Sequence, residues 1–320
     1  MFWEVVNNFP FYFIKIKNME KIYNKNSFKT TIGGQALIEG VMMKGPSKTA
    51  MVVRKPDGQI QIKTENNRDL SKKYKILKLP IIRGAYRLID AMVIGVRALN
   101  YSASFYNEEE NKKSNKLQEV GSVIFSLVIA ILFFMILPST LAGFFKKFIN
   151  NSVILNLIEG LIRLIIFFTY LFFISKLEDI KRVFMYHGSE HRTIHCYEAK
   201  KELTVENVQS FPIVHPRCGT SFLFMVMIIS ILVLSFFGWP NILLRFITRI
   251  LAFPLIAGIS YEINRFIGKS DSRIAKVLSI PGLAIQKYFT VKEPTDDMVE
   301  VAISSLKEVL PKEGESDLWK

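Results

Sequence analysis

Long apolar runs dominate the hydrophobic pattern of the chain. Four of them are about as long as a bilayer-spanning helix requires, namely residues 120–145, 152–175, 219–237 and 242–261. The first and the third contain no charged residue. The second contains Glu159 and Arg163, which lie four residues apart and can therefore pair on one helical face. The pattern predicts an α-helical, multi-pass membrane protein with about four transmembrane helices.

A fifth apolar segment, residues 79–101, has the pattern of an amphipathic helix. Its polar residues recur near one helical stripe, and they include Arg83, Arg87, Asp90 and Arg97. A wide apolar arc beside one charged stripe is typical of a helix that lies in the membrane interface. A helix whose polar face packs against the bundle would have the same pattern. We expect an interfacial helix here, and the sequence leaves open whether it enters the membrane.

Shorter patterns predict the elements outside the membrane. Residues 50–63 alternate apolar and polar side chains around Pro56-Asp57-Gly58, which predicts a β-hairpin because Pro presets the turn and Gly accepts positive φ. The glycine-rich residues 33–43 precede this hairpin and include Glu39, either a buried carboxylate or a solvated residue of a strand lead-in. Residues 295–310 have the start, spacing and stop signals of an amphipathic helix.

Composition and charge agree with a membrane protein. The chain has 320 residues, half of them hydrophobic, with a mean hydropathy of +0.24 and a net charge of +14. These values exclude a disordered chain, a disulfide-stapled secreted domain and a collagen-like fibre. Lys and Arg are concentrated in residues 1–119 and 176–218, so the positive-inside rule places these segments and both termini in the cytosol. We expect the basic surface to contact anionic lipid headgroups, and no nucleic-acid recognition module is visible.

The chain divides accordingly into six segments. They are an N-terminal extension (1–32), a cytosolic segment with the glycine-rich residues, the hairpin and the amphipathic helix (33–119), two transmembrane helices (120–175), a cytosolic His/Cys loop (176–218), two further transmembrane helices (219–262) and a cytosolic C-terminal tail with an amphipathic helix (263–320).

All four histidines and both cysteines of the chain fall in the His/Cys loop. They are His187, His191, His195, His215, Cys196 and Cys218. Dispersed core histidines and structural cysteines would not gather in this way, and a disulfide is not expected in a reducing compartment. Co-located imidazole and thiol groups predict a divalent metal site, and zinc is the ion that they favour.

The local spacing of residues 187–191 is H-x-x-E-H. On a helix, His187 and His191 share a face and can bind one ion, while the adjacent Glu190 can serve as general base for a bound water. Further ligands must come from elsewhere, and the candidates are His215, Cys218, Glu198, Glu206 and Glu262. Gly188 and Ser189 are poor residues for the middle of a helix, which weakens this interpretation.

Other interpretations of these residues remain open. A closed structural zinc site would need no catalysis, and hydrogen-bonded histidines beside a buried thiol would need no metal. Cys218 and His215 could instead form a thiolate–imidazolium pair, although neighbouring loop residues rarely reach that geometry. The pair Glu159 and Arg163 raises a third class, a channel or transporter, because intramembrane charges often mark a transport path.

Several longer blocks resemble the YqhQ-like domain-of-unknown-function family of bacterial membrane proteins. They extend from about Gly33 to about Leu310 and read GGQALIEGVMMKGP (33–46), VRKPDG (53–58), PIIRG (80–84), YHGSEHRTIHCYEAKKELTVENV (186–208), HPRCGTSF (215–222), PLIAGISYE (254–262), PGLAIQ (281–286) and EPTDDMVEVAI (293–303). The stretch YFTVKEP (288–294) departs slightly from the family form without touching a candidate ligand.

The resemblance implies a metal-dependent protein of the bacterial inner membrane, and it names no substrate. The residues that match the family pattern are Glu39, His187, Glu190, His191, Glu198, Glu206, His215, Cys218 and Glu262, whereas His195 and Cys196 fall outside it. We therefore expect His187, His191, His215 and Cys218 as metal ligands and Glu190 as the catalytic base, with Glu39, Glu198, Glu206 and Glu262 as additional candidates. The expected function is metal-dependent hydrolysis of a membrane-associated substrate. The alternatives are a non-catalytic scaffold or regulator with a structural metal site, and a transporter.

Overall fold

A four-stranded antiparallel sheet opens the part of the chain that the computed structural model describes, residues 28–106 and 116–319. The strands follow one another in chain order as β1 (Gly33–Leu37), β2 (Gly40–Lys44), β3 (Lys48–Arg54) and β4 (Ile60–Asn66). The predicted hairpin of residues 50–63 is confirmed as β3 and β4, and Gly58 in its turn has φ +83°. The glycine-rich residues form a second hairpin, β1–β2, with Glu39 in its turn. Most of the expected N-terminal extension and the residues 107–115 lie outside the described residues.

Strands β2 and β3 are buried on both faces because helices cover each side of the sheet. On one side, Val41 and Val52 pack among residues of α7 (Glu178–Glu198) and α12 (Asp296–Lys307). On the other side, Met42 and Met51 pack with Ala98 of α3 (Ile82–Ala103). Successive strand residues point to opposite faces, so these strands carry unbroken apolar runs where a half-exposed strand would alternate.

The apolar runs form a bundle of helices. Its members are α4 (Lys116–Ile131), α5 (Leu137–Gly143), α6 (Ser152–Ile174), α9 (Gly219–Ser235) and α10 (Ile242–Lys269), with a π-helical turn (Leu132–Ile136) between α4 and α5 and a 3-10 turn (Phe144–Lys147) after α5. In the described chain, three helical stretches are long and apolar enough to cross a membrane, namely Val120–Lys147, Ser152–Ile174 and Ile242–Lys269. In Val120–Lys147, no residue of the most apolar part is buried inside the protein. The side chains there therefore need an apolar environment outside the chain.

Three of the four expected spans are helices long and apolar enough to cross a membrane. The remaining one, α9, is a shorter apolar helix of 17 residues, at the lower end of the length that a spanning helix needs. Helix α10 continues to Lys269, beyond the predicted run, and it is long and apolar enough to cross a membrane despite its two buried arginines. Arg249 of α10 donates to the Glu159 carboxylate of α6, which also accepts from Arg163 at 2.7 Å, so the charges of the two helices pair with one another.

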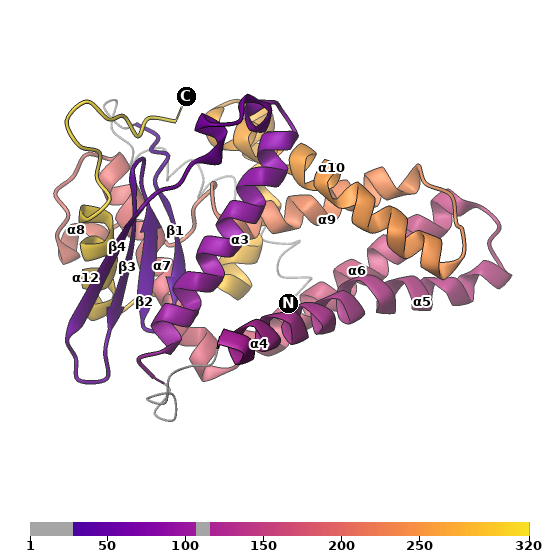
Figure 1. The fold of residues 1–320 in the computed structure, drawn as a ribbon, viewed down its shortest axis with the longest axis horizontal. Coiled ribbons are helices and arrows are strands. Elements are labelled where there is room, and N and C mark those ends of the chain that lie inside the picture. The colour runs from indigo at the N-terminus through magenta and orange to yellow at the C-terminus, as the bar shows by residue number, and fades with distance from the viewer. Residues whose placement is uncertain (1–27, 107–115, 320) are drawn as a thin grey trace.

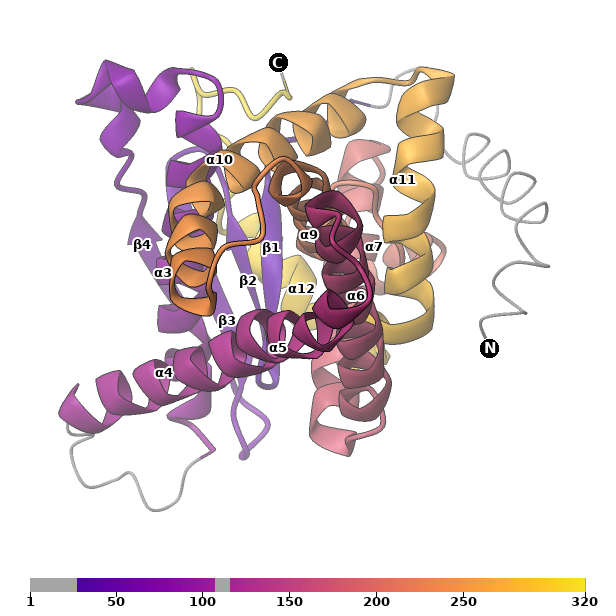
Figure 2. The ribbon, with the colours of Figure 1, turned by 90° about the vertical axis from the view of Figure 1, so that its right-hand side faces the viewer.

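Helix α3 lies between the sheet and the bundle. Figure 1 shows the sheet with α7, α8 (Val205–Gln209) and α12 at one end and the bundle at the other, while α3 runs across the bundle helices rather than along them. It packs closely against α10, because Gly84 of α3 meets Gly258 of α10 without intervening side chains. From the bundle end, α3 and α11 (Arg273–Ile285) lie on opposite sides of α6 and α9 (Figure 2).

The segment expected as a His/Cys loop is largely helical. Helix α7 occupies residues 178–198 of it and α8 residues 205–209. Gly188 lies in the middle of α7 because a Cβ atom there would stand 2.2 Å from the carbonyl oxygen of Lys292. The close approach of α7 to this backbone therefore outweighs the poor helix propensity of Gly188.

Candidate metal centre

Helix α7 carries three histidines on one buried face. His187, His191 and His195 recur every four residues, so successive imidazoles lie one above the other, with ring centroids of the first two 4.3 Å apart. The segment that leads into α9 brings His215 and Cys218 to this face, and Cys218 is the N-cap residue of α9. The four histidines and Cys218 therefore lie close together, although His187 and Cys218 are 31 residues apart in the sequence.

Three of these residues form a compact set of ligand atoms. One atom each of His187, His191 and Cys218 lies within 4.8 Å of the others, and His187 Nε2 is 3.2 Å from Cys218 Sγ. His187 donates its Nδ1–H to the carbonyl of Thr290 at 2.9 Å, and His191 donates its Nδ1–H to the carbonyl of Ile213 at 2.6 Å. A carbonyl only accepts, so both rings carry the proton on Nδ1 and a lone pair on Nε2. Metal-binding histidines are oriented in the same way.

The Nε2 atom of His191 is buried and has no hydrogen-bond partner among the described residues. A buried polar atom without a partner is costly, so a bound ligand is the simplest explanation for it. Burial lowers the pKa of His191 to about 4, which keeps the imidazole neutral at neutral pH. Burial would raise the pKa of Cys218, but the neighbouring His191 and the hydrogen bond from the Thr220 backbone N–H lower it below its usual value. Neutral imidazole and thiolate are the forms that bind a metal.

Glu190 places its carboxylate between the two imidazoles. Its Oε2 atom lies 3.8 Å from Nε2 of both His187 and His191, while its Oε1 atom accepts from the backbone N–H of Gly34 at 3.0 Å. Burial raises the pKa of Glu190 to about 7. Strand β1 can approach the carboxylate because residue 34 is glycine, where a Cβ atom would stand 3.1 Å from Glu190 Cγ and 2.4 Å from the Met42 carbonyl oxygen.

A second set of donors, His195, Glu198 and His215, has ligand atoms within 4.8 Å of one another. It already contains a cation, because Arg217 donates to the Glu198 carboxylate and its Nη2 atom lies 3.4 Å from His215 Nε2. Glu198 also accepts from the backbone N–H of Thr30 at 2.8 Å. A divalent ion would be repelled by the buried guanidinium, so these residues suit a hydrogen-bonded support for the first set. Sequence reasoning did not single out Arg217, although it lies in the HPRC block.

The remaining candidate residues belong to neither set. Glu39 pairs with Arg182 and accepts from Tyr186 Oη at 3.1 Å, and Glu262 pairs with Arg83. Glu206 is exposed in the first turn of α8. Cys196 is buried in an apolar cluster beside α12, and burial raises the pKa of its thiol to about 11. Glu39, Glu206 and Glu262 are thus positioned for other contacts than metal binding at this site.

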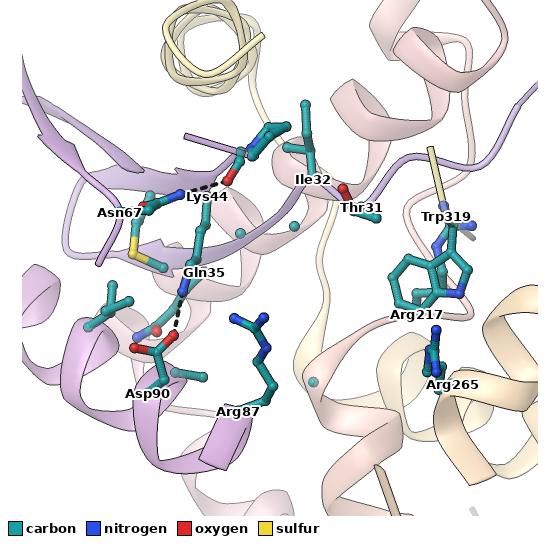
Figure 3. Close-up of a pocket in the computed structure, with 18 of the residues that line it drawn as sticks. Thr31, Ile32, Gln35, Lys44, Asn67, Arg87, Asp90, Arg217, Arg265 and Trp319 are labelled. Atoms are coloured by element: carbon teal, nitrogen blue, oxygen red, sulfur yellow. Dashed lines mark hydrogen bonds and ion pairs between the residues drawn. The ribbon is translucent and has the colours of Figure 1, made fainter. Parts of the chain in front are cut away.

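The first set of candidate ligands lines a cavity of about 930 Å³. The cavity lies among β1, α3, α7, α10 and the C-terminal residues, and Figure 3 shows Lys44, Asp90 and Arg87 on one side and Arg217, Arg265 and Trp319 on the other. His187, Glu190, His191 and Cys218 all contribute to its wall. The candidate metal centre is therefore accessible to a ligand larger than water.

The fold and the site define a helical protein with an antiparallel sheet and a His–His–Cys cluster. The chain belongs to the family described as protein of unknown function (DUF1385), whose model matches residues 79–312. It is 35% identical over 308 residues to the uncharacterized protein YqhQ of Bacillus subtilis (strain 168), a match that covers 92% of this chain and 96% of that protein. The predicted resemblance to a YqhQ-like family is confirmed. No solved structure matches the chain.

Proposed function

We propose that this protein is a metal-dependent hydrolase of the bacterial inner membrane, with both termini in the cytosol and a membrane-associated substrate. The observation that carries the proposal is the orientation of two histidines. Because the Nδ1–H groups of His187 and His191 are engaged by backbone carbonyls, their Nε2 lone pairs remain beside Cys218 Sγ for one ion. Two imidazoles and a thiolate favour zinc.

Glu190 supplies the proton acceptor in this proposal. A zinc ion bound here would provide a water molecule of lowered pKa. The Oε2 atom of Glu190, 3.8 Å from both imidazole nitrogens, is placed to take a proton from a molecule bound beside them. Its pKa of about 7 suits a general base at neutral pH, and the Gly34 N–H holds the other oxygen in place.

A structural zinc site in a non-catalytic scaffold or regulator is the second candidate. It is favoured by the same 3.8 Å distances, because Glu190 is close enough to act as a fourth ligand and close the coordination sphere. The two candidates differ in what Glu190 does. A base can be replaced without loss of metal, whereas a ligand cannot.

The two cysteines offer a matched test of the metal site. Both are buried, and only Cys218 belongs to the ligand set. We expect Cys218→Ser to weaken zinc binding at least about tenfold in chelator competition, because a hydroxyl is a far poorer zinc ligand than a thiolate, and Cys196→Ser to leave it unchanged. Equal zinc affinity in both variants would contradict the ligand assignment.

Glu190→Gln then separates catalysis from structure. If Glu190 is the base, the variant keeps its zinc and fails to complement a strain that lacks the protein. Loss of zinc together with function would favour the structural site. Unchanged complementation with zinc retained would refute the hydrolase proposal.

A further inference from the structure

The cavity at the metal centre is lined by an excess of basic side chains. Seven line it, namely Lys44, Arg68, Lys78, Arg83, Arg87, Arg217 and Arg265, against the three carboxylates Asp69, Asp90 and Glu190. Two further carboxylates, which do not line the cavity, pair with two of these arginines: Glu198 with Arg217 and Glu262 with Arg83. The basic side chains still outnumber the acidic ones, so the cavity favours an anionic ligand.

Donors on opposite sides of the cavity are placed to hold such a ligand. Arg87 extends from α3, and Arg217, Arg265 and Trp319 face it from the other side (Figure 3). The indole N–H of Trp319 is buried and has no acceptor within the described part of the chain. Guanidinium groups bind phosphate oxygens in pairs, and an indole N–H can only donate. The set therefore matches the oxygens of a phosphate group.

Helix α3 separates this basic cavity from an exposed apolar surface. Arg83, Arg87 and Asp90 face the cavity. Another face of the same helix exposes Ile89, Met92, Val93 and Val96, with Ile89 61% exposed. This spacing of three, four and seven residues forms one continuous stripe.

The segment before α3 extends the apolar surface and adds positive charge. It contains two short 3-10 turns, Leu70–Lys72 and Lys75–Lys78. Its exposed apolar residues are Leu70, Tyr74, Ile76 and Leu79, and its lysines are Lys72, Lys73, Lys75 and Lys78. Apolar side chains interleaved with lysines are typical of a segment at an anionic bilayer surface. Lys78 and its neighbour Leu77 also line the cavity, so the cavity borders this segment directly.

We propose that the cavity binds the phosphate headgroup of an anionic phospholipid whose acyl chains leave along the segment before α3. Arg87, Arg265 and Trp319 hold the phosphate, and the apolar stripe of α3 keeps the cavity at the level of the lipid headgroups. The proposal rests on the proposed function in one respect, since the lipid is then the substrate class of the His–His–Cys centre. Binding itself requires neither the metal nor Glu190.

Trp319 makes the test possible in the full-length protein. The chain has three tryptophans, so Trp3→Phe combined with Trp239→Phe leaves Trp319 as the reporter. The probes are water-soluble dihexanoyl phosphatidic acid, dihexanoyl phosphatidylcholine and inorganic phosphate, titrated into detergent-purified protein. We expect saturable binding of phosphatidic acid at least about tenfold tighter than that of phosphatidylcholine or phosphate.

Two arginines of α3 provide the matched variants. Arg87 lines the cavity and pairs with Asp69 at 3.0 Å, whereas Arg97 lies outside the cavity and pairs with Glu65 at 3.2 Å. We expect Arg87→Gln to weaken binding of phosphatidic acid about tenfold, the usual effect of losing one charge-assisted hydrogen bond, and Arg97→Gln to leave it unchanged. Arg265→Gln provides a second variant with the same expected effect if Arg87→Gln does not fold.

Three outcomes would overturn the proposal. They are equal affinity for the two lipids, equal loss in the Arg87 and Arg97 variants, and inorganic phosphate binding as tightly as phosphatidic acid, which would identify a soluble phosphate as the ligand. Failure of the hydrolase proposal is a separate result. Glu190→Gln and His187→Ala/His191→Ala proteins should still bind phosphatidic acid, whether or not the wild-type protein hydrolyses anything.

Discussion

Replacing Glu190 by Gln should stabilise the metal-free protein at high pH. The carboxyl group of Glu190 has a pKa of about 7 in the folded protein, raised from 4.5 by burial. A raised folded-state pKa means that the group contributes stability below pH 4.5 and that this contribution is lost as the pH rises through 7. Glutamine has nearly the same shape as glutamate and does not ionise, so the Glu190→Gln protein does not lose this stability as the pH rises.

The size of the effect follows from the two pKa values. A shift from 4.5 to about 7 corresponds to about 3 kcal/mol when the group is fully ionised in both states, and about 2.5 kcal/mol of it is lost between pH 5 and pH 8. The advantage of Glu190→Gln over wild type in the free energy of unfolding should therefore grow by roughly that amount over this pH range.

The assay is thermal or denaturant unfolding in detergent, with a chelator present, at pH 5 and pH 8. Glu206→Gln is the control, because Glu206 is an exposed carboxylate of α8. Its difference from wild type should be nearly the same at both pH values. A Glu190→Gln advantage that does not change with pH, or a wild-type protein that is the more stable at pH 8, would refute the burial argument.

Three further predictions concern the surroundings of the site. Gly34→Ala should destabilise the protein by about 2 kcal/mol by overpacking, because the added Cβ atom would stand 2.4 Å from the Met42 carbonyl oxygen. Gly33→Ala should be nearly neutral, because no atom lies within 4 Å of its added Cβ atom. Chemical unfolding measures the free energy of unfolding of both variants. Arg217→Gln should cost about 3–5 kcal/mol in the same assay, because it leaves the buried carboxylate of Glu198 without its cation, and an unchanged midpoint would contradict that pairing. Zinc affinity should fall as the pH is lowered toward 4, because the imidazoles, including His191 with its pKa of about 4, and the thiolate of Cys218 take up protons, and a flat profile in chelator competition across pH 4–8 would contradict binding by imidazole and thiolate.

The apolar runs were predictable because a bilayer-length stretch without charge has few alternative structures. The boundaries depend on tertiary contacts and were less predictable. Helix α10 continues to Lys269 although Arg245 and Arg249 interrupt its apolar pattern, since Arg249 pairs with Glu159 of another helix. The β3–β4 hairpin followed from local turn chemistry, whereas the burial of β2 and β3 on both faces depends on helices far along the chain.

The arrangement of the candidate site was predictable only where it depends on local spacing. The spacing of His187, Glu190 and His191 is local, so the sequence is enough to place them on one face. The choice between Cys218 and His215 as the further donor depends on the path of the chain before α9 and on Arg217, which pairs beside His215. Residues 176–218 were expected as a loop between two spans, and Gly188 weakened the interpretation of residues 187–191 as a helix. The close approach of Gly188 to the Lys292 carbonyl explains why a glycine lies in the middle of α7.

Metal content tests the central claim most directly. Elemental mass spectrometry on detergent-purified protein, wild type beside His187→Ala/His191→Ala, should find about one zinc per chain in the wild type and none in the double variant. One ion rather than two is expected because Arg217 already occupies the second set of donors. Equal metal content in the two proteins, or no bound metal in the wild type after reconstitution with zinc, would contradict the account of the site.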